Sequence, residues 1–296
     1  MGRKPPHDQH SAATLLAAIA DQLPDNGLDD RRRDARLLLA MALERDEAVL
    51  PHEEITVTPK QHQALNTLIA RRQQGEPISR MRGWREFYSL NFKMNPATLD
   101  PRADSEVVVD QVLAYLRHGD MPQPRLLDLG TGTGCLLLAS LNNHPNAIGV
   151  GVDVQPDAVV MANQNAHSLG LSDRAEFFVS SWDSAIGDQW AAEGQFDVII
   201  SNPPYIPSHD LLTLMDEVKN YDPPLALDGG ADGLEAWRAL APVMSRRLRD
   251  DGVVFVEIGQ GQDDAVTAIF KDVGLNLVAK YPDLSGVNRC LQFNKD

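Results

Sequence analysis

The tetrapeptide Asn202-Pro203-Pro204-Tyr205 carries the residue types best suited to chemistry in this 296-residue chain. It follows the apolar, β-branched run 196–201, which predicts a buried parallel strand ending at the carboxyl edge of a sheet, where open α/β sheets bind ligands. Two adjacent prolines lack an N–H and fix two φ angles, so their carbonyl oxygens are rigid and free to accept hydrogen bonds. An Asn oxygen, a bare carbonyl and an aromatic ring suit a planar group that bears an NH2. Pro-Pro alone is more often a simple turn, but its neighbours and a glycine-rich loop upstream favour a chemical role.

The glycine-rich loop has the residue types of a cofactor site. Gly130-Thr131-Gly132-Thr133-Gly134 lies between a predicted strand at 125–129 and a predicted helix at 135–142. Glycines let the backbone pass close to a ligand. Asp153 lies 19 residues past the last of these glycines, at the end of the next predicted strand. A carboxylate in that position can accept hydrogen bonds from both hydroxyls of a ribose.

The spacing of the glycines distinguishes two kinds of nucleotide cofactor. Dinucleotide enzymes use Gly-x-Gly-x-x-Gly to seat a pyrophosphate, whereas this loop reads Gly-x-Gly-x-Gly and follows Asp128. A carboxylate disfavours a pyrophosphate and suits a ligand with a cationic end, such as a sulfonium that carries an α-amino group. The loop therefore predicts S-adenosyl-L-methionine as cofactor, with S-adenosyl-L-homocysteine as product. Trp182 and Asp183, which follow the predicted strand 175–179, are expected to flank the adenine and hydrogen-bond to it.

Alternating elements position these residues. From residue 125 onwards the sequence repeats strand, loop and helix, which predicts a parallel sheet covered on both faces. An antiparallel pair at 275–281 and 287–293 is expected to close the chain. The remaining predicted strands are 125–129, 148–152, 175–179, 196–201 and 253–258, and the predicted helices are 104–113, 135–142, 156–169, 233–248 and 263–273.

The front of the chain has a different pattern. Residues 1–10 are polar and are expected to be disordered. Three amphipathic helices are predicted at 11–22, 29–43 and 59–75, with Ser11, Asp29 or Asp30, and Thr58 as capping residues. Residues 83–95 alternate in polarity and predict a β-hairpin. The expected domains are a helical substrate-recognition domain at 1–82, a hairpin linker at 83–100 and a cofactor-binding catalytic domain at 101–296.

The charge of the chain restricts its partners. The net charge is -15, and residues 86–296 hold 14 Lys/Arg against 30 Asp/Glu, whereas residues 1–85 hold 13 against 12. An acidic surface repels phosphate backbones, so free nucleic acid is not an expected partner. The balanced front of the chain presents a different surface, with a different expected role.

The remaining features indicate a cytoplasmic location. No apolar run reaches the roughly 20 residues that cross a bilayer, so no membrane is expected as a partner. Export is a minor alternative, because the Ala-rich run 12–20 follows two basic residues but is weakly hydrophobic. Cys135 and Cys290 lie in apolar runs and are predicted to be small core residues, not a disulfide or a metal site. Nothing in the sequence requires more than a monomer.

The motifs resemble those of known methyltransferases. Asp128-Leu-Gly-Thr-Gly-Thr-Gly134 resembles the first motif of class I S-adenosylmethionine-dependent methyltransferases. Asn202-Pro-Pro-Tyr205 resembles the catalytic motif of those that methylate amide or exocyclic amine nitrogens. Further segments resemble the HemK/PrmC protein-glutamine methyltransferases: Pro77-Ile78, Gly83, Glu86-Phe87, Pro96-Ala97-Thr98-Leu99, Pro101-Arg102, Glu106 and Asp283-Leu-Ser-Gly-Val-Asn-Arg289.

This resemblance implies a Rossmann-like class I sheet, mostly parallel with an antiparallel last strand, behind a small N-terminal helical bundle. It implies methylation of the side-chain amide of the glutamine in the Gly-Gly-Gln loop of class I peptide-chain release factors, without a metal. Asn202, Pro203, Pro204 and Tyr205 would bind the glutamine, Asn202 would also contact the cofactor, and Arg102 would lie at the substrate site. Asp100 and Ala103, close to Arg102, depart from the family pattern.

Other functions stay open at this point. A glutamine of a ribosomal protein is an alternative substrate. An exocyclic amine of a nucleic acid is another, but it would require a basic channel that the acidic catalytic region argues against. A non-catalytic binding module would not need the intact tetrapeptide.

Overall fold

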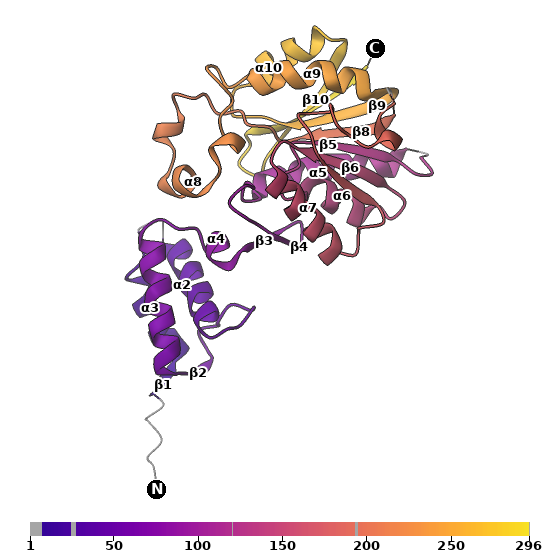
Figure 1. Cartoon of the computed structure of the whole chain (residues 1–296). Coiled ribbons are helices and arrows are strands. Elements are labelled where there is room, and N and C mark those ends of the chain that lie inside the picture. Colours follow the sequence, from indigo (N-terminus) through magenta and orange to yellow (C-terminus); the bar gives the residue numbers. More distant parts are fainter. Residues whose placement is uncertain (1–7, 25–27, 120, 193–194, 296) are drawn as a thin grey trace. The chain divides into compact units, whose positions relative to one another are not determined.

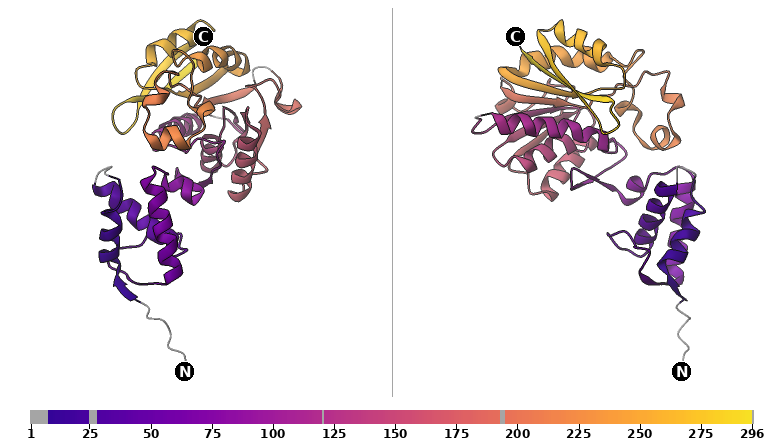
Figure 2. Two further views of the ribbon diagram at one scale, coloured as in Figure 1. Left: turned by 60° about the vertical axis from the view of Figure 1, so that its left-hand side comes forward. Right: turned by 180° about the vertical axis from the view of Figure 1, so that it is seen from behind.

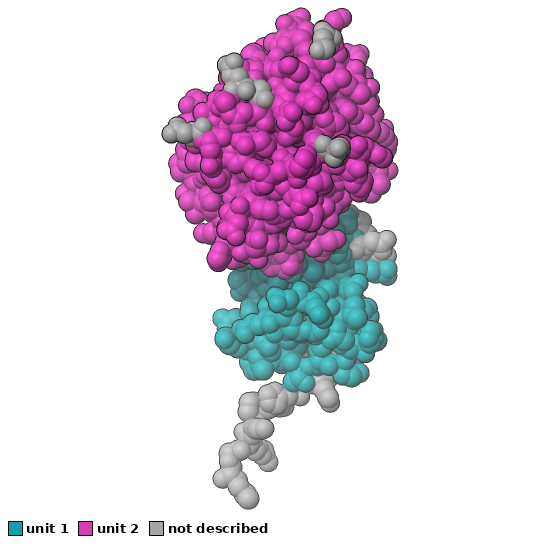
Figure 3. Space-filling model, turned by 90° about the vertical axis from the view of Figure 1, so that its right-hand side faces the viewer, with its two compact units in different colours: residues 1–83 teal, residues 84–296 magenta. Residues whose placement is uncertain are grey.

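The computed structural model describes residues 8–24, 28–119, 121–192 and 195–295. The chain forms two compact units, Met1–Gly83 and Trp84–Asp296, which Figure 3 shows in different colours. No described helix is long and apolar enough to cross a membrane.

The first unit is a helical bundle with a two-stranded sheet. Its elements are β1 (Asp8–Ser11), α1 (Ala12–Ala20), α2 (Leu28–Ala42), β2 (Glu54–Val57), α3 (Pro59–Gln73) and α4 (Ile78–Arg82). The three predicted helices are present. Thr58 and Gln61 form a reciprocal capping box at the start of α3, in which the Gln61 amide donates to Thr58 Oγ1 over 3.3 Å and the Thr58 amide donates to Gln61 Oε1 over 2.9 Å. The apolar faces of the helices meet in a shared core that includes Leu16, Ile19, Leu38, Leu39 and Leu65.

The beginning of the chain differs from the sequence-based expectation. The disorder expected for residues 1–7 lies outside the described residues, and for residues 8–10 the expectation is wrong, because β1 pairs antiparallel with β2. Ser11 precedes α1 as expected, but its side chain makes no capping hydrogen bond. Ser11 instead pairs through its backbone with Glu54 of β2. Such pairing is hard to predict from a short polar segment.

The second unit is built on a seven-stranded sheet (Figure 1). The strand order is β10-β11-β9-β8-β5-β6-β7, and β11 runs in the opposite direction to the other six strands of this sheet. This confirms the predicted class I sheet and its antiparallel last strand. The strands are β5 (Arg125–Leu129), β6 (Ile148–Asp153), β7 (Ala175–Val179), β8 (Phe196–Ser201), β9 (Leu248–Glu257), β10 (Leu275–Pro282) and β11 (Asn288–Lys295).

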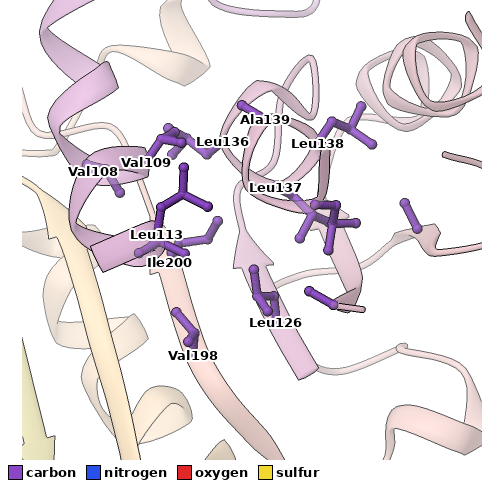
Figure 4. Close-up of a cluster of buried hydrophobic side chains, with 14 of the residues drawn as sticks. Val108, Val109, Leu113, Leu126, Leu136, Leu137, Leu138, Ala139, Val198 and Ile200 are labelled. Atoms are coloured by element: carbon purple, nitrogen blue, oxygen red, sulfur yellow. The ribbon is translucent and has the colours of Figure 1, made fainter. Parts of the chain in front are cut away.

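Helices pack on both faces of the sheet (Figures 1 and 2). One face is covered by α5 (Glu106–His118), α6 (Cys135–Asn143) and α7 (Pro156–Ser168), and the other by α9 (Glu235–Arg247) and α10 (Asp263–Lys271). Figure 4 shows Leu126, Val198 and Ile200 of two strands among side chains of α5 and α6. Cys290 is buried in this core and Cys135 packs against it, as predicted. Burial raises the pKa of both thiols, to about 12 for Cys135.

The predicted hairpin is present as β3 (Trp84–Phe87) and β4 (Leu90–Lys93), and it belongs to the second unit. Tyr88 and Ser89 have φ angles of 52° and 60°, as in the two-residue type I′ turns that match strand twist. Tyr88 therefore lies in the turn, whereas the alternation within residues 83–95 had predicted a strand position for it. Phe87 and Phe92 are the buried aromatic residues of the hairpin.

The register of the central strands brings the predicted site residues to one edge. Leu129 lies opposite both Val152 and Ser201, so β5, β6 and β8 end at the same level. The Ser201 hydroxyl donates to the Leu129 carbonyl over 2.6 Å and fixes the ends of β5 and β8 to each other. The loops that follow these three strands consequently leave the sheet side by side.

Candidate active site

The glycine-rich loop leaves β5 in a conformation that its glycines permit. Gly132 has a φ angle of 55°, and a Cβ there would meet no atom within 4 Å. The amides of Gly130 and Thr131 both donate to the Val152 carbonyl, over 2.9 and 2.8 Å. The loop is therefore held against the end of β6, with the open side of Gly132 free for a ligand.

Asp128 lies at the end of β5, under this loop. It is 1% exposed, and its Oδ2 accepts a hydrogen bond from Thr131 Oγ1 over 2.6 Å, while its Oδ1 has no hydrogen-bond partner among the described residues. Burial raises the pKa of Asp128 to about 7. A cationic ligand near Asp128 would stabilise the ionised carboxylate, because its positive charge would offset the free-energy cost of burying a negative charge.

Asp153 ends β6 on the other side of the loop. Its Oδ2 accepts from the Gly132 amide and its Oδ1 from the Gln155 amide, both over 2.9 Å. Burial raises the pKa of this carboxyl group, and the two amide hydrogen bonds lower it. Each carboxylate oxygen keeps a further lone pair, so Asp153 can still accept hydrogen bonds from a diol.

A cavity of about 230 Å³ runs along these loops. Of the residues predicted to hold a cofactor, Gly130, Gly132, Asp153, Trp182 and Asn202 line it. The other predicted cofactor residues of this segment do not line it: Asp128, Thr131 and Thr133 are buried, and Gly134 precedes α6. Further lining residues that sequence reasoning missed are Ala97, Leu99, Val152, Val154, Gln155, Ser180, Ser181, Leu225 and Ala226.

Trp182 and Asp183 have separate places in the structure. Trp182 lines the cavity beside Gly130, whereas Asp183 is not among the lining residues. The Asp183 carboxylate accepts from Arg246 Nη2 over 2.6 Å and from Arg247 Nε over 2.7 Å. The prediction that Asp183 hydrogen-bonds an adenine is therefore not supported, because two arginines of α9 bind this carboxylate instead. Local sequence could not reveal partners so distant in the chain.

Asn202 and the two prolines line the same cavity from the end of β8. The Asn202 amide nitrogen, Nδ2, donates to the hydroxyl oxygen of Ser105 over 3.3 Å. Ser105 is buried and precedes α5. Because Nδ2 is engaged with Ser105, Oδ1 is the atom of this amide that remains to accept a hydrogen bond from a ligand.

The segment after the prolines is tightly held. Gln262 Nε2 donates to the Tyr205 carbonyl over 2.9 Å. The backbone of Tyr205 also touches two glycines closely, since a Cβ on Gly229 would lie 2.8 Å from Tyr205 Cα and one on Gly233 would lie 2.5 Å from Tyr205 O. This packing fixes the position of the tetrapeptide, and its parts come from loops that pattern analysis had not assigned to the site.

A second cavity, also of about 230 Å³, adjoins the first. The two share Leu99, Asn202, Pro203 and Ala226 as lining residues. The second cavity is lined in addition by Arg102, Asp104, Tyr205, Ile206, Leu214, Val218, Leu227, Glu257 and Arg289. Asn202 and Pro203 thus face two spaces, one bordered by the glycine-rich loop and one bordered by charged side chains.

Arg102 lies at the second cavity, as the resemblance had implied for a substrate site. Its guanidinium group is paired with the buried carboxylate of Asp222, which also accepts from the Asp100 amide over 3.3 Å. Asp100, one of the two departures from the family pattern, is itself buried and accepts from Arg85 Nη1 over 3.1 Å. The polar residue at position 100 is therefore accommodated by a hairpin arginine.

No group of three or more His, Cys, Asp or Glu side chains within the described residues is arranged to hold a metal ion.

The sheet order, the glycine-rich loop after β5 and Asn-Pro-Pro-Tyr after β8 define a methyltransferase of class I fold. A methyltransferase-domain family matches residues 122–266, and the PrmC N-terminal domain family matches residues 14–83. The hMettl16 catalytic domain, solved in complex with MAT2A 3′UTR hairpin 6, shares the fold with a TM-score of 0.56 and 14% identity, over 94% of this chain and 92% of that chain. At this identity the similarity concerns the fold alone.

Closer relatives assign the chain within that class. The release factor glutamine methyltransferase of Rhodospirillum rubrum is 44% identical over 97% of this chain and 87% of its own length. That of Caulobacter vibrioides is 40% identical over 92% of both chains, and a bifunctional methyltransferase of Rickettsia felis is 32% identical over 97% of this chain and 58% of its own length. The chain belongs to the family of release factor glutamine methyltransferases.

Proposed function

We propose that this methyltransferase transfers a methyl group from S-adenosyl-L-methionine to the side-chain amide nitrogen of the glutamine in the Gly-Gly-Gln loop of class I peptide-chain release factors. The observation that supports this most strongly is that Asn202 and Pro203 line both cavities at once. A cofactor in the first cavity and a glutamine in the second would meet at these two residues. Release factors act on the ribosome, so the proposed location is the cytoplasm.

The first cavity fits S-adenosyl-L-methionine by its chemistry. Asp128 does not line the cavity, but its buried carboxyl group lies two residues before the lining residue Gly130, and its negative charge would favour a cationic ligand there. Asp153 and Trp182 line this cavity, where Asp153 would accept hydrogen bonds from the ribose hydroxyls and Trp182 would contact the adenine. When bound, S-adenosyl-L-methionine supplies an electrophilic methyl group.

The second cavity would position the acceptor. A glutamine amide nitrogen is a weak nucleophile, because its lone pair is delocalised into the carbonyl group. Asn202 Oδ1 and the Pro203 carbonyl would accept its two N–H groups, orient the nitrogen and favour loss of planarity in the transition state. The nitrogen gains a methyl group and releases one proton. Tyr205 would pack on the planar amide.

Methyl-labelled cofactor provides the test. Purified protein is incubated with the labelled cofactor and a release factor, or with the same factor carrying alanine in place of the loop glutamine. We expect label on the unaltered factor only. Label on neither, with cofactor binding intact, would contradict the proposed substrate and favour a ribosomal protein or a nucleic-acid amine.

A further inference from the structure

Trp182, which lines the first cavity, has a strained backbone conformation. Its φ angle is 53°, in the left-handed region that residues with a Cβ atom rarely adopt. The side chain is half-buried and packs against the core between the sheet and α9, with ring atom Cζ3 4.0 Å from the place that a Cβ on Gly130 would occupy. A conformation of this kind persists only where the surrounding structure holds it.

The chain before Trp182 is fixed to the neighbouring strand. The Ser180 amide, directly after β7, donates to the carbonyl of Asp153 at the end of β6 over 2.9 Å. The Ser184 amide donates to the Ser181 carbonyl over 3.3 Å and closes a turn, with Trp182 at its second position. One side of this turn is therefore anchored at the cofactor cavity itself.

The chain after Trp182 is fixed to α9 by Asp183. The Asp183 side chain is 10% exposed, and its Oδ2 accepts from Arg246 Nη2 over 2.6 Å and from Arg247 Nε over 2.7 Å. Arg247 is itself buried, and its Nη1 donates to the Ala192 carbonyl over 3.2 Å. Burial opposes ionisation of Asp183, but the hydrogen bonds from the two arginines outweigh it and hold the pKa of this group below its ordinary value of 3.8. Asp183 is therefore a carboxylate at neutral pH.

This ion-pair cluster fixes geometry more than it adds stability. Burying charged groups costs free energy that largely offsets their attraction, but two guanidinium groups on one carboxylate leave it little freedom to move. Neither Asp183 nor its two arginines are among the residues that line the first cavity. Their effect on a ligand there is expected to pass through Trp182, the lining residue next to Asp183 in the chain.

We propose that Asp183 is a positioning residue for the cofactor, which acts through its ion pairs with α9 to hold Trp182 in the left-handed conformation that places its ring at the first cavity. The proposal rests on the proposed function, because it takes the adenine of S-adenosyl-L-methionine to lie against Trp182. Asp183 needs no contact with the cofactor for this role.

A double-mutant cycle separates the positioning of Trp182 from a general effect on the fold. The measurement is the Kd of S-adenosyl-L-homocysteine, determined by calorimetry for the unaltered protein, Asp183→Asn, Trp182→Ala and the double variant. Asp183→Asn keeps the shape of the side chain but removes the charge that binds both arginines. We expect the Kd to rise about 10-fold in Asp183→Asn and about 10- to 30-fold in Trp182→Ala. In the absence of the Trp182 ring, Asp183→Asn should change the Kd by less than about 2-fold, because the side chain that it positions is gone.

Asp232→Asn is the matched control. The Asp232 carboxylate also binds an arginine of α9, since Arg238 Nη1 donates to Oδ1 over 3.0 Å and Arg238 Nη2 to Oδ2 over 2.5 Å. Asp232 is exposed and is not among the lining residues of either cavity. Loss of this ion pair should leave the Kd of S-adenosyl-L-homocysteine unchanged.

Two results overturn the proposal: a Kd in Asp183→Asn within about 2-fold of that of the unaltered protein, or an equal loss of affinity with and without the Trp182 ring. If Asp183→Asn does not fold, Arg246→Ala replaces it, because the Arg246 side chain is 40% exposed and its loss leaves the ion pair with Arg247. The Kd should then rise about 3- to 5-fold, and only while the ring is present; an unchanged Kd overturns the proposal. Absence of binding to the unaltered protein would contradict the proposed function as well.

Discussion

The two cavities that meet at Asn202 and Pro203 are built in different ways. The first is formed by short loops that directly follow adjacent strands, with Gly130 and Gly132 after β5 and Asp153 at the end of β6. The second takes its charged residues from segments far apart in the chain, including Arg102, Glu257 and Arg289. The proposed cofactor cavity is therefore encoded by short local motifs, whereas the proposed acceptor cavity depends on contacts between segments that are distant in the sequence.

Substitution of Asn202 should have the largest effect, and it should lower kcat far more than it lowers cofactor affinity. In Asn202→Ala the acceptor loses a hydrogen-bond partner that matters most in the transition state, so kcat should fall by about 10³-fold or more. The Kd of S-adenosyl-L-homocysteine, measured by calorimetry, should stay within about 3-fold, because the glycine-rich loop and Asp153 are untouched. Asn163→Ala, an exposed position of α7, is the matched control. A variant of Asn202 with normal kcat would contradict the assignment of the acceptor site.

Substitution of Asp128 should have the opposite effect, lowering cofactor affinity far more than kcat. Asp128→Asn removes the buried negative charge, and we expect cofactor affinity to fall by about 100-fold through loss of a charge-assisted interaction. At saturating cofactor, kcat should change little. Asp157→Asn, an exposed acid in the first turn of α7, is the control, and calorimetry again measures the affinity. A loss of kcat with unchanged affinity would show that the two cavities are not separable in this way.

The raised pKa of Asp128, about 7, predicts a pH dependence of cofactor binding. The ionised form binds the cationic ligand, so affinity should weaken as the pH falls below about 7 and approach a loss of about 10-fold per pH unit. Folding stability should change in the opposite direction. Burial favours the protonated carboxyl group, so the folded, ligand-free protein should become less stable as the pH rises from 3.8, the ordinary pKa of this group, to about 7, its pKa in the folded protein. Binding and denaturation curves across this range test both effects, since Asp128→Asn should lack each of them.

The smallest effect is expected at Arg102. Arg102→Ala removes one partner of the buried Asp222 carboxylate, which should destabilise the fold by about 1–3 kcal/mol. We expect the KM for the release factor to rise about 3- to 10-fold and the cofactor Kd to remain unchanged. Arg117→Ala, an exposed arginine of α5, is the control. Weaker cofactor binding in Arg102→Ala would argue against placing this residue on the acceptor side.

The same contrast explains which features the sequence could predict. The strands, the glycine-rich loop and the tetrapeptide were predictable because strand periodicity and adjacent motif residues are local patterns. Ser105 and Arg289 were missed as site residues because their roles depend on contacts across the fold. Glu257 did carry a signal, as an acid at the carboxyl end of the predicted strand beside the tetrapeptide strand. Asp183, predicted as a cofactor residue, lies outside the lining of the first cavity and pairs with arginines of α9, which local sequence could not reveal.

The local elements follow the same division. The helix α3 was predicted from Thr58 and Pro59, which encode its start directly. The strand β1 was missed, since only its pairing with β2 reveals it. The short helix α8 (Asp216–Tyr221) was missed as well, because six residues offer too little periodicity.

The most direct test of the two-cavity arrangement is a titration of a peptide containing the Gly-Gly-Gln sequence into the protein saturated with S-adenosyl-L-homocysteine. The account predicts that peptide and cofactor product bind together, and that Asn202→Ala weakens binding of the peptide without releasing the product. If the product excluded the peptide, or if the peptide bound equally well to Asn202→Ala, the assignment of the second cavity to the glutamine would be contradicted.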